Sequence, residues 1–224
     1  MPVLPPLGND VVDLAAPGNL GKSGDGRFLG RVFTAEERAL IAGAARPDTL
    51  LWALWAAKEA AYKAISHDDP AVCSIPRQYR VVLETGNEAG TAARFAGKVI
   101  TPRGELALRV AVTADWVHAL AAGSEEDIER ICQHVELREG TGSNVNPSTF
   151  VREALLREIA RFLGCASGDL SVVKDPGGPG APRVLFRGRL LAAEVSLSHD
   201  GRFAAFAFDP ATLIPADCIG RAKS

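Results

Sequence analysis

Hydrophobic residues recur at helical spacing from Leu50 to Ser66, a stretch rich in Ala, Leu, Lys and Glu that contains neither Gly nor Pro. This pattern predicts a helix. The buried side of that helix is expected to carry Leu51, Leu54, Trp55, Tyr62 and Ile65. A second helix is predicted over residues 147–163, with a proline at its first turn and a glycine after its last. Thr34 and Glu37 fit a capping box, which predicts a further helix to about Ala44.

Alternating and β-branched patterns predict strands in both halves of the chain. The predicted strands cover residues 11–14, 78–83, 98–100 and 106–112, then 184–186, 193–197 and 202–208. Asp10 is placed near the start of the first strand, beside the small Gly8. Ser124 can cap a helix to about Arg138 whose apolar residues share one side. The segment 140–146, GTGSNVN, is predicted to be a linker.

One segment of the chain is echoed by a later one. Arg103-Gly104, a strand, an Asp at 115 and a further apolar run recur as Arg187-Gly188, a strand, an Asp at 200 and another apolar run. This weak repeat fits two similar α+β lobes related by a pseudo-twofold axis. We expect each lobe to be a small antiparallel sheet packed with a long helix. The expected limits are an N-terminal lobe at 1–123, a connecting helix and linker at 124–147, a C-terminal lobe at 148–216 and a tail at 217–224.

The amino-acid composition argues against several classes of protein. The chain has 224 residues, of which 47% are hydrophobic, and a net charge of −2, which implies no general affinity for nucleic acid or membranes. No apolar stretch approaches the ~20 residues that span a bilayer. The four cysteines are far apart and form no C-x-x-C pair, so reduced thiols in a cytoplasmic protein are expected. The first ten residues lack the basic-then-apolar pattern of a signal peptide.

Glu59 and Lys63 are the first candidates for chemistry. They stand four positions apart and therefore share a face of the predicted helix, flanked by small alanines. A carboxylate and an ammonium on a face without bulky side chains could receive a metal ion and a phosphate group together. The alternative is an ordinary solvated ion pair, and Lys58 could equally be a solvated neighbour. No ligand spacing is visible for His67, His118 or His134, and no role is assigned to them.

Three stretches in combination resemble the 4′-phosphopantetheinyl transferase superfamily. They are Gly8-x-Asp10, Trp55-x-x-Lys58-Glu59-Ala60-x-x-Lys63 and Val195-Ser196-Leu197-Ser198-His199. Their order along the chain resembles holo-acyl-carrier-protein synthase, as does the segment 27–34. The region 151–199 is similar to the N-terminal half of the larger, two-lobed transferases, so the order of the lobes is permuted relative to those enzymes. The resemblance implies two lobes in one polypeptide, with the active site between them.

The resemblance also implies a reaction and a set of roles. The family moves 4′-phosphopantetheine from coenzyme A to a serine of an apo carrier protein and releases adenosine 3′,5′-bisphosphate. Asp10 and Glu59 match its Mg²⁺ ligands, and Glu59 is the candidate base, directly or through a metal-bound water. Lys63 can reach a pyrophosphate oxygen as a point charge. Ser198 and His199 match residues that hold coenzyme A phosphates.

Some residues depart from the family pattern. Asn9 stands where an apolar residue is usual, and Val12 stands where some two-lobed members carry a third acidic ligand, with Asp13 after it. Ala181 replaces the Lys of a Gly-Lys-Pro loop, which removes a phosphate contact that Arg183 could supply. Two other functions therefore stay open. One is a non-catalytic coenzyme A- or carrier-binding protein of the same fold, and the other is a Mg²⁺-dependent hydrolase of nucleotide pyrophosphates.

The expected macromolecular partner is an apo acyl or peptidyl carrier protein. Arg27 and Arg31 could contact such an acidic partner, as basic residues near this segment do in the synthase, or could be unpartnered surface arginines. Because both lobes are expected in one chain, a functional monomer is predicted. The sequence does not resolve which carrier protein is modified.

Overall fold

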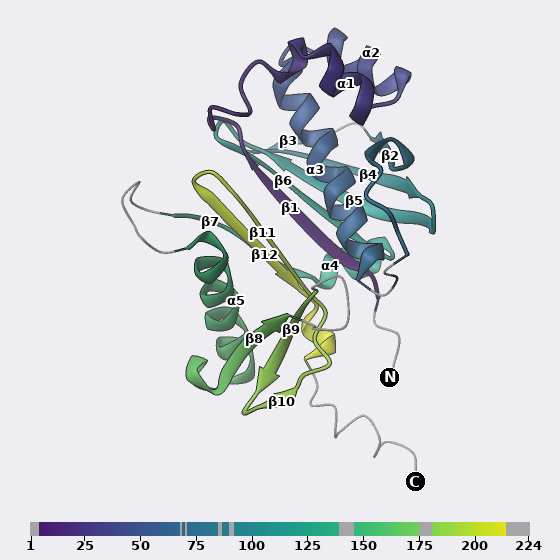
Figure 1. The fold of residues 1–224 in the computed structure, drawn as a ribbon. Helices are drawn as coiled ribbons and strands as arrows, with labels where there is room; N and C mark the ends of the chain where they lie inside the picture. The colour runs from purple at the N-terminus through teal and green to yellow at the C-terminus, as the bar shows by residue number, and fades with distance from the viewer. Residues whose placement is uncertain are drawn as a thin grey trace.

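The computed structural model describes residues 5–67, 69, 71–84, 87–89, 92–138, 146–174 and 181–213, and within these it forms an α+β fold of antiparallel sheets (Figure 1). The helices are α1 Gly26–Val32, α2 Ala35–Gly43, α3 Pro47–Ser66, α4 Glu125–Arg130 and α5 Pro147–Leu163. The strands are β1 Leu7–Asp13, β2 Arg80–Leu83, β3 Asn87–Ala89, β4 Ala92–Thr101, β5 Gly104–Val112, β6 Trp116–Ala122, β7 Cys132–Leu137, β8 Leu170–Lys174, β9 Pro182–Phe186, β10 Arg189–Leu190, β11 Val195–Asp200 and β12 Phe203–Phe208. No helix in these ranges is long and apolar enough to cross a membrane.

The first half of the chain builds a sheet with the strand order β1-β6-β5-β4-β2, with β3 also paired to β4, and α3 packs across one face of it (Figure 1). β1 and α3 approach closely because Gly8 faces the helix. A Cβ on Gly8 would lie 2.0 Å from the carbonyl oxygen of Ala60 and 2.7 Å from the backbone nitrogen of Ala64. The small alanines that flank Glu59 are fully buried, so they provide close packing and not the open face that the sequence predicted.

The second half forms two three-stranded sheets, β11-β12-β7 and β10-β9-β8. α5 packs against them through an apolar side that includes Val151, Leu155 and Ile159, which meet Phe206 and Phe208 of β12. The predicted bounds of α5 are confirmed, and the helix ends at a glycine with φ of 65°, a conformation that glycine adopts without steric cost.

The helix predicted from Ser124 to Arg138 is wrong beyond its first turns. The Ser124 side chain does cap α4, but that helix ends at Arg130, and residues 132–137 form β7. β7 pairs antiparallel with β12, with Val135 opposite Ala205. The apolar spacing of residues 132–137 is compatible with a helix or a strand, and backbone pairing with β12 favours the strand. The residues predicted to connect the lobes thus supply an edge strand of the second sheet, while the lobe limits stay a prediction.

Several other predictions of helices, caps and strands are confirmed. The helix at 50–66 and the capping box of Thr34 and Glu37 are confirmed, and the predicted strands after position 77 all correspond to observed strands. Asp10 is not near a strand start but in the middle of β1, opposite Ala119 of β6. α1, β3, β6, β8 and β10 were not predicted. Residues 140–145 of the linker predicted at 140–146, and the predicted tail at 217–224, lie outside the described residues.

The two halves meet along β1 and β11, each an edge strand of its own sheet. Side chains join them: the backbone N–H of Asn9 donates to Ser196 Oγ at 2.9 Å, and the backbone N–H of Asp13 donates to Asp200 Oδ2 at 2.9 Å. Hydrogen bonds at both ends of the contact fix the register of one half against the other. The pseudo-twofold relation between the halves stays a prediction.

Candidate active site between the two halves

The alternation of β1 divides its side chains between two faces. Gly8, Asp10 and Val12 face α3, whereas Asn9, Val11 and Asp13 face the second half of the chain. Asp10 Oδ1 accepts a hydrogen bond from Lys63 Nζ at 2.8 Å, and the same ammonium donates to the backbone oxygen of Asn9 at 3.0 Å. The structure therefore brings Asp10 and Lys63, 53 positions apart in the sequence, into direct contact.

Glu59 lies one turn before Lys63 on α3, and the charges of Asp10 and Lys63 both act on its carboxyl group. Burial raises the pKa of the Glu59 carboxyl, the Asp10 carboxylate raises it further, and Lys63 opposes both. Burial likewise raises the pKa of Asp10, against the opposing effect of Lys63. Two half-buried carboxylates that repel each other are therefore held beside one ammonium. Such a pair is stabilised in its ionised form by an added cation.

The donor set suits Mg²⁺. The carboxylates of Asp10 and Glu59 interact electrostatically, and in the described ranges no group of three or more His, Cys, Asp or Glu side chains converges as a metal site. Mg²⁺ is commonly held by one or two carboxylates, with phosphate oxygens and water completing its shell. The residues present thus fit this ion together with a phosphate-bearing ligand.

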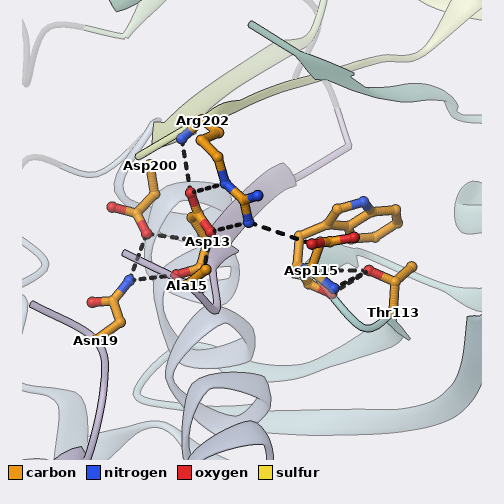
Figure 2. A network of polar contacts seen from close by, with 8 residues as sticks. Asp13, Ala15, Asn19, Thr113, Asp115, Asp200 and Arg202 are labelled. Atoms are coloured by element: carbon orange, nitrogen blue, oxygen red, sulfur yellow. Dashed lines mark hydrogen bonds and ion pairs between the residues drawn. The ribbon is translucent and has the colours of Figure 1, made fainter. Parts of the chain in front are cut away.

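Asp13, the acid after Val12, is engaged elsewhere. Arg202 forms a bidentate pair with it, Nε to Oδ2 at 2.9 Å and Nη2 to Oδ1 at 2.8 Å, and the Arg202 backbone N–H donates to Oδ2 as well (Figure 2). A Cβ on Gly201 would lie 2.4 Å from Asp13 Oδ2, so glycine allows the β11–β12 turn to close over this carboxylate. Asp13 therefore joins the two halves and is not placed to serve as a third metal ligand.

Ser198 and His199 come from β11, across the contact from Asp10. Ser198 is buried, and its Oγ accepts a hydrogen bond from Asn9 Nδ2 at 3.2 Å. His199 is exposed on the opposite face of the strand. Desolvation lowers its pKa, Lys63 and Arg138 add to that effect, and Asp200 and Asp10 oppose it. His199 thus lies within electrostatic range of the Asp10–Lys63 pair, although no direct contact joins them.

A cleft of about 230 Å³ opens between the C-terminal end of α3 and the strands β9 and β11. Tyr62, Lys63 and His67 line its α3 side, and Ala181 and Leu197 are among the residues opposite. A buried pair between His67 Nδ1 and Glu194 Oε1 ties the two sides together. The cleft joins the charged residues of α3 to the strand that carries Ser198 and His199.

Lys58 is not a solvated neighbour of Glu59. Its side chain is 1% exposed, and its ammonium donates to Glu37 Oε1 at 2.8 Å and to the backbone oxygens of Pro76 and Tyr79. Glu37 in turn accepts from the N–H of Val81 and closes the capping box of α2. Lys58 therefore fixes α3 against its neighbours, which sets the direction in which Glu59 points.

Sequence reasoning missed two polar residues at this site, Asn9 as a contact between the halves and His118 as its neighbour. Asn9 Nδ2 lies 3.2 Å from His118 Nε2, and both residues are buried. A signal existed for each, because His118 interrupts the apolar run of β6 and Asn9 stands at a position where the family resemblance predicts an apolar residue. A polar residue buried in such a stretch needs a partner, but the sequence does not say which.

Comparisons with known proteins identify the family. Residues 6–121 match the family model described as the 4′-phosphopantetheinyl transferase superfamily, and the chain belongs to that superfamily. The matched range contains Asp10, Glu59 and Lys63, while Ser198 and His199 lie beyond it. The chain is also similar to a holo-[acyl-carrier-protein] synthase of Bradyrhizobium diazoefficiens, with 32% identity over 128 residues that cover 51% of this chain and 88% of that protein.

Proposed function

We propose that this protein transfers 4′-phosphopantetheine from coenzyme A to a serine of an apo acyl or peptidyl carrier protein and releases adenosine 3′,5′-bisphosphate. The observation that carries the proposal is that Lys63, which lines a cleft between the two halves, contacts Asp10, and that both residues act electrostatically on Glu59. The superfamily match and the named synthase relative support the same reaction.

Each residue has a role that its position allows. The serine oxygen attacks the phosphorus next to the pantetheine arm, its proton passes to Glu59, and the bond to the bisphosphate oxygen breaks. The raised pKa of Glu59 makes this carboxylate a stronger base than an exposed glutamate. Lys63 neutralises charge on the phosphoryl oxygens, and Ser198 and His199 hold phosphates of coenzyme A. Mg²⁺, held by Asp10 and Glu59, would supply further neutralisation of the pyrophosphate.

The direct test is intact-mass measurement of apo carrier proteins incubated with coenzyme A, MgCl₂ and this protein. We expect the mass of one phosphopantetheine to be added to at least one carrier from a panel of fatty-acid, polyketide and peptide-synthetase types. Excess EDTA should stop the reaction. The absence of an adduct on every carrier, with pure folded protein, would contradict the proposal.

A matched pair of variants tests the assigned base. Glu59→Gln keeps the shape of the side chain but cannot accept the proton, so kcat should fall roughly 10²- to 10⁴-fold. The control is Glu105→Gln on β5, where the glutamate side chain is 56% exposed and pairs only with Lys98 among the described contacts. This control should keep the activity of the wild type.

One observation favours a second function, that of a non-catalytic coenzyme A- or carrier-binding protein. Ala181 lines the cleft where the family resemblance predicts a lysine, so one cation expected to hold phosphate is replaced by a methyl group. A binding protein would show affinity for coenzyme A without turnover. It would also show no difference in mass transfer between the wild type and Glu59→Gln.

A further inference from the structure

Asn9 is the polar centre of the contact between the two halves. It is fully buried, and four of its hydrogen-bonding positions are accounted for. Its backbone N–H donates to Ser196 Oγ and its backbone oxygen accepts from Lys63 Nζ. Its side-chain Nδ2 lies 3.2 Å from both His118 Nε2 and Ser198 Oγ. Asn9 therefore contacts a candidate catalytic residue on one side and a candidate phosphate-binding residue on the other.

The direction of the hydrogen bonds follows from His118. Burial, with a smaller contribution from Lys63, lowers the pKa of His118 to about 4, so the imidazole is neutral near pH 7. Its Nε2 can then accept one N–H of the Asn9 amide, which requires the ring proton to be on Nδ1. The second N–H of the same amide donates to Ser198 Oγ.

The opposite orientation of the amide is less favourable. Asn9 Oδ1 is buried and has no hydrogen-bond partner within the described residues. Turning the amide over would place two N–H donors at that position in place of one acceptor. Burying two unpaired donors costs more than burying one unpaired acceptor. The observed orientation, with Nδ2 toward His118 and Ser198, is therefore the one that packing favours.

This orientation determines what the Ser198 hydroxyl can do. Its oxygen already accepts from Asn9, and in the part of the chain that the structure describes it donates to no group. The hydroxyl hydrogen is thus directed away from Asn9 and is available to an acceptor. Ser198 is itself buried and does not line the cleft, but β11 borders the cleft through Val195, Ser196 and Leu197, directly before it. A phosphate oxygen of a ligand bound at this edge would be the strongest acceptor for the hydroxyl.

We propose that Asn9 and His118 are positioning residues that orient the Ser198 hydroxyl to donate its hydrogen to a phosphate oxygen of coenzyme A. The proposal rests on the proposed function for the identity of the ligand. It gives a reason for a polar residue at position 9, where the family resemblance predicts an apolar one. An apolar side chain there would leave Ser198 free to turn its hydroxyl inward, toward His118.

A double-mutant cycle tests the proposal by isothermal titration of coenzyme A. Asn9→Leu is close to isosteric and should weaken binding roughly tenfold, since it misdirects one hydrogen bond to a charged group. In a Ser198→Ala background the same substitution should have an effect of less than about twofold. An equal loss in both backgrounds would mean that Asn9 only supports the fold, and the proposal would be overturned.

Two variants of His118 distinguish the effect of its hydrogen-bond acceptor from the effect of its side-chain volume. Gln can place an oxygen close to the position of Nε2, so His118→Gln should bind coenzyme A within about twofold of the wild type. His118→Leu should weaken binding as Asn9→Leu does. If both variants bind alike, the imidazole acceptor has no positioning role. Thermal melts of each variant identify any that fail to fold.

The wild-type protein offers a test that needs no variant and no ligand. Nitrogen-15 NMR at pH 7 should show His118 with its proton on Nδ1, assigned by the loss of that signal in His118→Gln. A proton on Nε2 would reverse the hydrogen bonds and overturn the proposal. If the wild-type protein binds coenzyme A without transferring phosphopantetheine, the proposed function is contradicted. The double-mutant cycle can still be measured in that case, because it depends on binding alone. Protein that binds no coenzyme A would overturn both.

Discussion

Lys58 and Glu59 are adjacent in the sequence, yet their side chains occupy different environments on α3. Burial lowers the pKa of Lys58, while the hydrogen bond and charge of Glu37 oppose the change. The ammonium is enclosed by Glu37 and two carbonyl oxygens, whereas Glu59 faces Asp10 and Lys63. The first residue of this pair is structural, and the second is a candidate for chemistry.

Replacing Lys58 by methionine should therefore reduce stability. We expect Lys58→Met to lower the free energy of unfolding by about 3 kcal/mol, because Glu37 would be left buried without its cation. Urea denaturation measures the loss. In the double variant Lys58→Met/Glu37→Gln the total loss should be smaller than the sum of the two single losses. A loss below about 1 kcal/mol in the single variant would mean that the pair behaves like an exposed one.

Asp13 gives a prediction about acid stability. Burial would raise the pKa of its carboxyl, but hydrogen bonds from Arg202 and from the N–H of Ala15 outweigh it and hold the pKa below its ordinary value of 3.8. A carboxylate with a lowered pKa stabilises the fold above its unfolded pKa and loses that contribution as the pH falls through its folded pKa. The stability due to Asp13 should thus be complete near pH 7.

Asp13→Asn should cost about 2 kcal/mol of unfolding free energy at pH 7, and the difference from the wild type should shrink below about pH 4. Chemical denaturation at several pH values measures both effects. The control is Asp115→Asn, since Asp115 lies 3.5 Å from Arg202 but its side chain is 63% exposed. That change should cost less than about 0.5 kcal/mol. A constant difference at all pH values would contradict the assignment.

At the scale of elements, the contact between β1 and α3 sets the distance between Asp10 and Lys63. The contact has no room for a side chain at position 8, because the nearest atoms belong to the backbone of α3. Backbone atoms cannot turn aside as a flexible side chain can. The strand would have to move away from the helix to admit even one methyl group.

Gly8→Ala should therefore lower the free energy of unfolding by about 3 kcal/mol and reduce transfer activity more than stability alone explains. The reason is that β1 would carry Asp10 away from Lys63. The control is Gly30→Ala in α1, where the nearest group to a new Cβ is the end of the Arg38 side chain at 3.7 Å. That variant should be unchanged or slightly more stable. Activity equal to the wild type in Gly8→Ala would contradict the predicted geometry.

At the scale of the whole molecule, the candidate site draws on both halves of one chain. Glu59 comes from the first half and His199 from the second, and the contact of β1 with β11 holds the halves together. An active site built within a single chain needs no second copy. We therefore predict that the protein is active as a monomer.

Mixing two inactive variants tests this prediction. Glu59→Gln and His199→Ala each remove one side of the site, so a mixture should stay inactive if every site forms within one chain. If sites formed between chains, some mixed sites would contain neither substitution, and activity would partly return. Sedimentation of the wild type should show the active species at 23.6 kDa. Recovery of activity on mixing would contradict the prediction.

Local residue patterns were sufficient to predict α3, α5 and the capping box of α2, but not α1 or the true end of α4. α3, α5 and the capping box depend on residues within about four positions of one another, so the sequence alone determined them. Candidate site residues could also be named in advance, because Asp10, Glu59, Lys63, Ser198 and His199 fall in recognisable motifs. What could not be predicted was the surroundings that give each of these residues its chemistry.

Only the tertiary structure decided the features that depend on remote partners. Residues 132–137 form a strand because they pair with the backbone of β12, although their apolar spacing is also compatible with a helix. Asp10 lies in the middle of β1. The Asn9 side chain forms a hydrogen bond with Ser198, which is 189 positions away in the sequence. The physical reason is that burial and hydrogen-bond partners across a contact are set by packing between segments, which no local pattern of residues encodes.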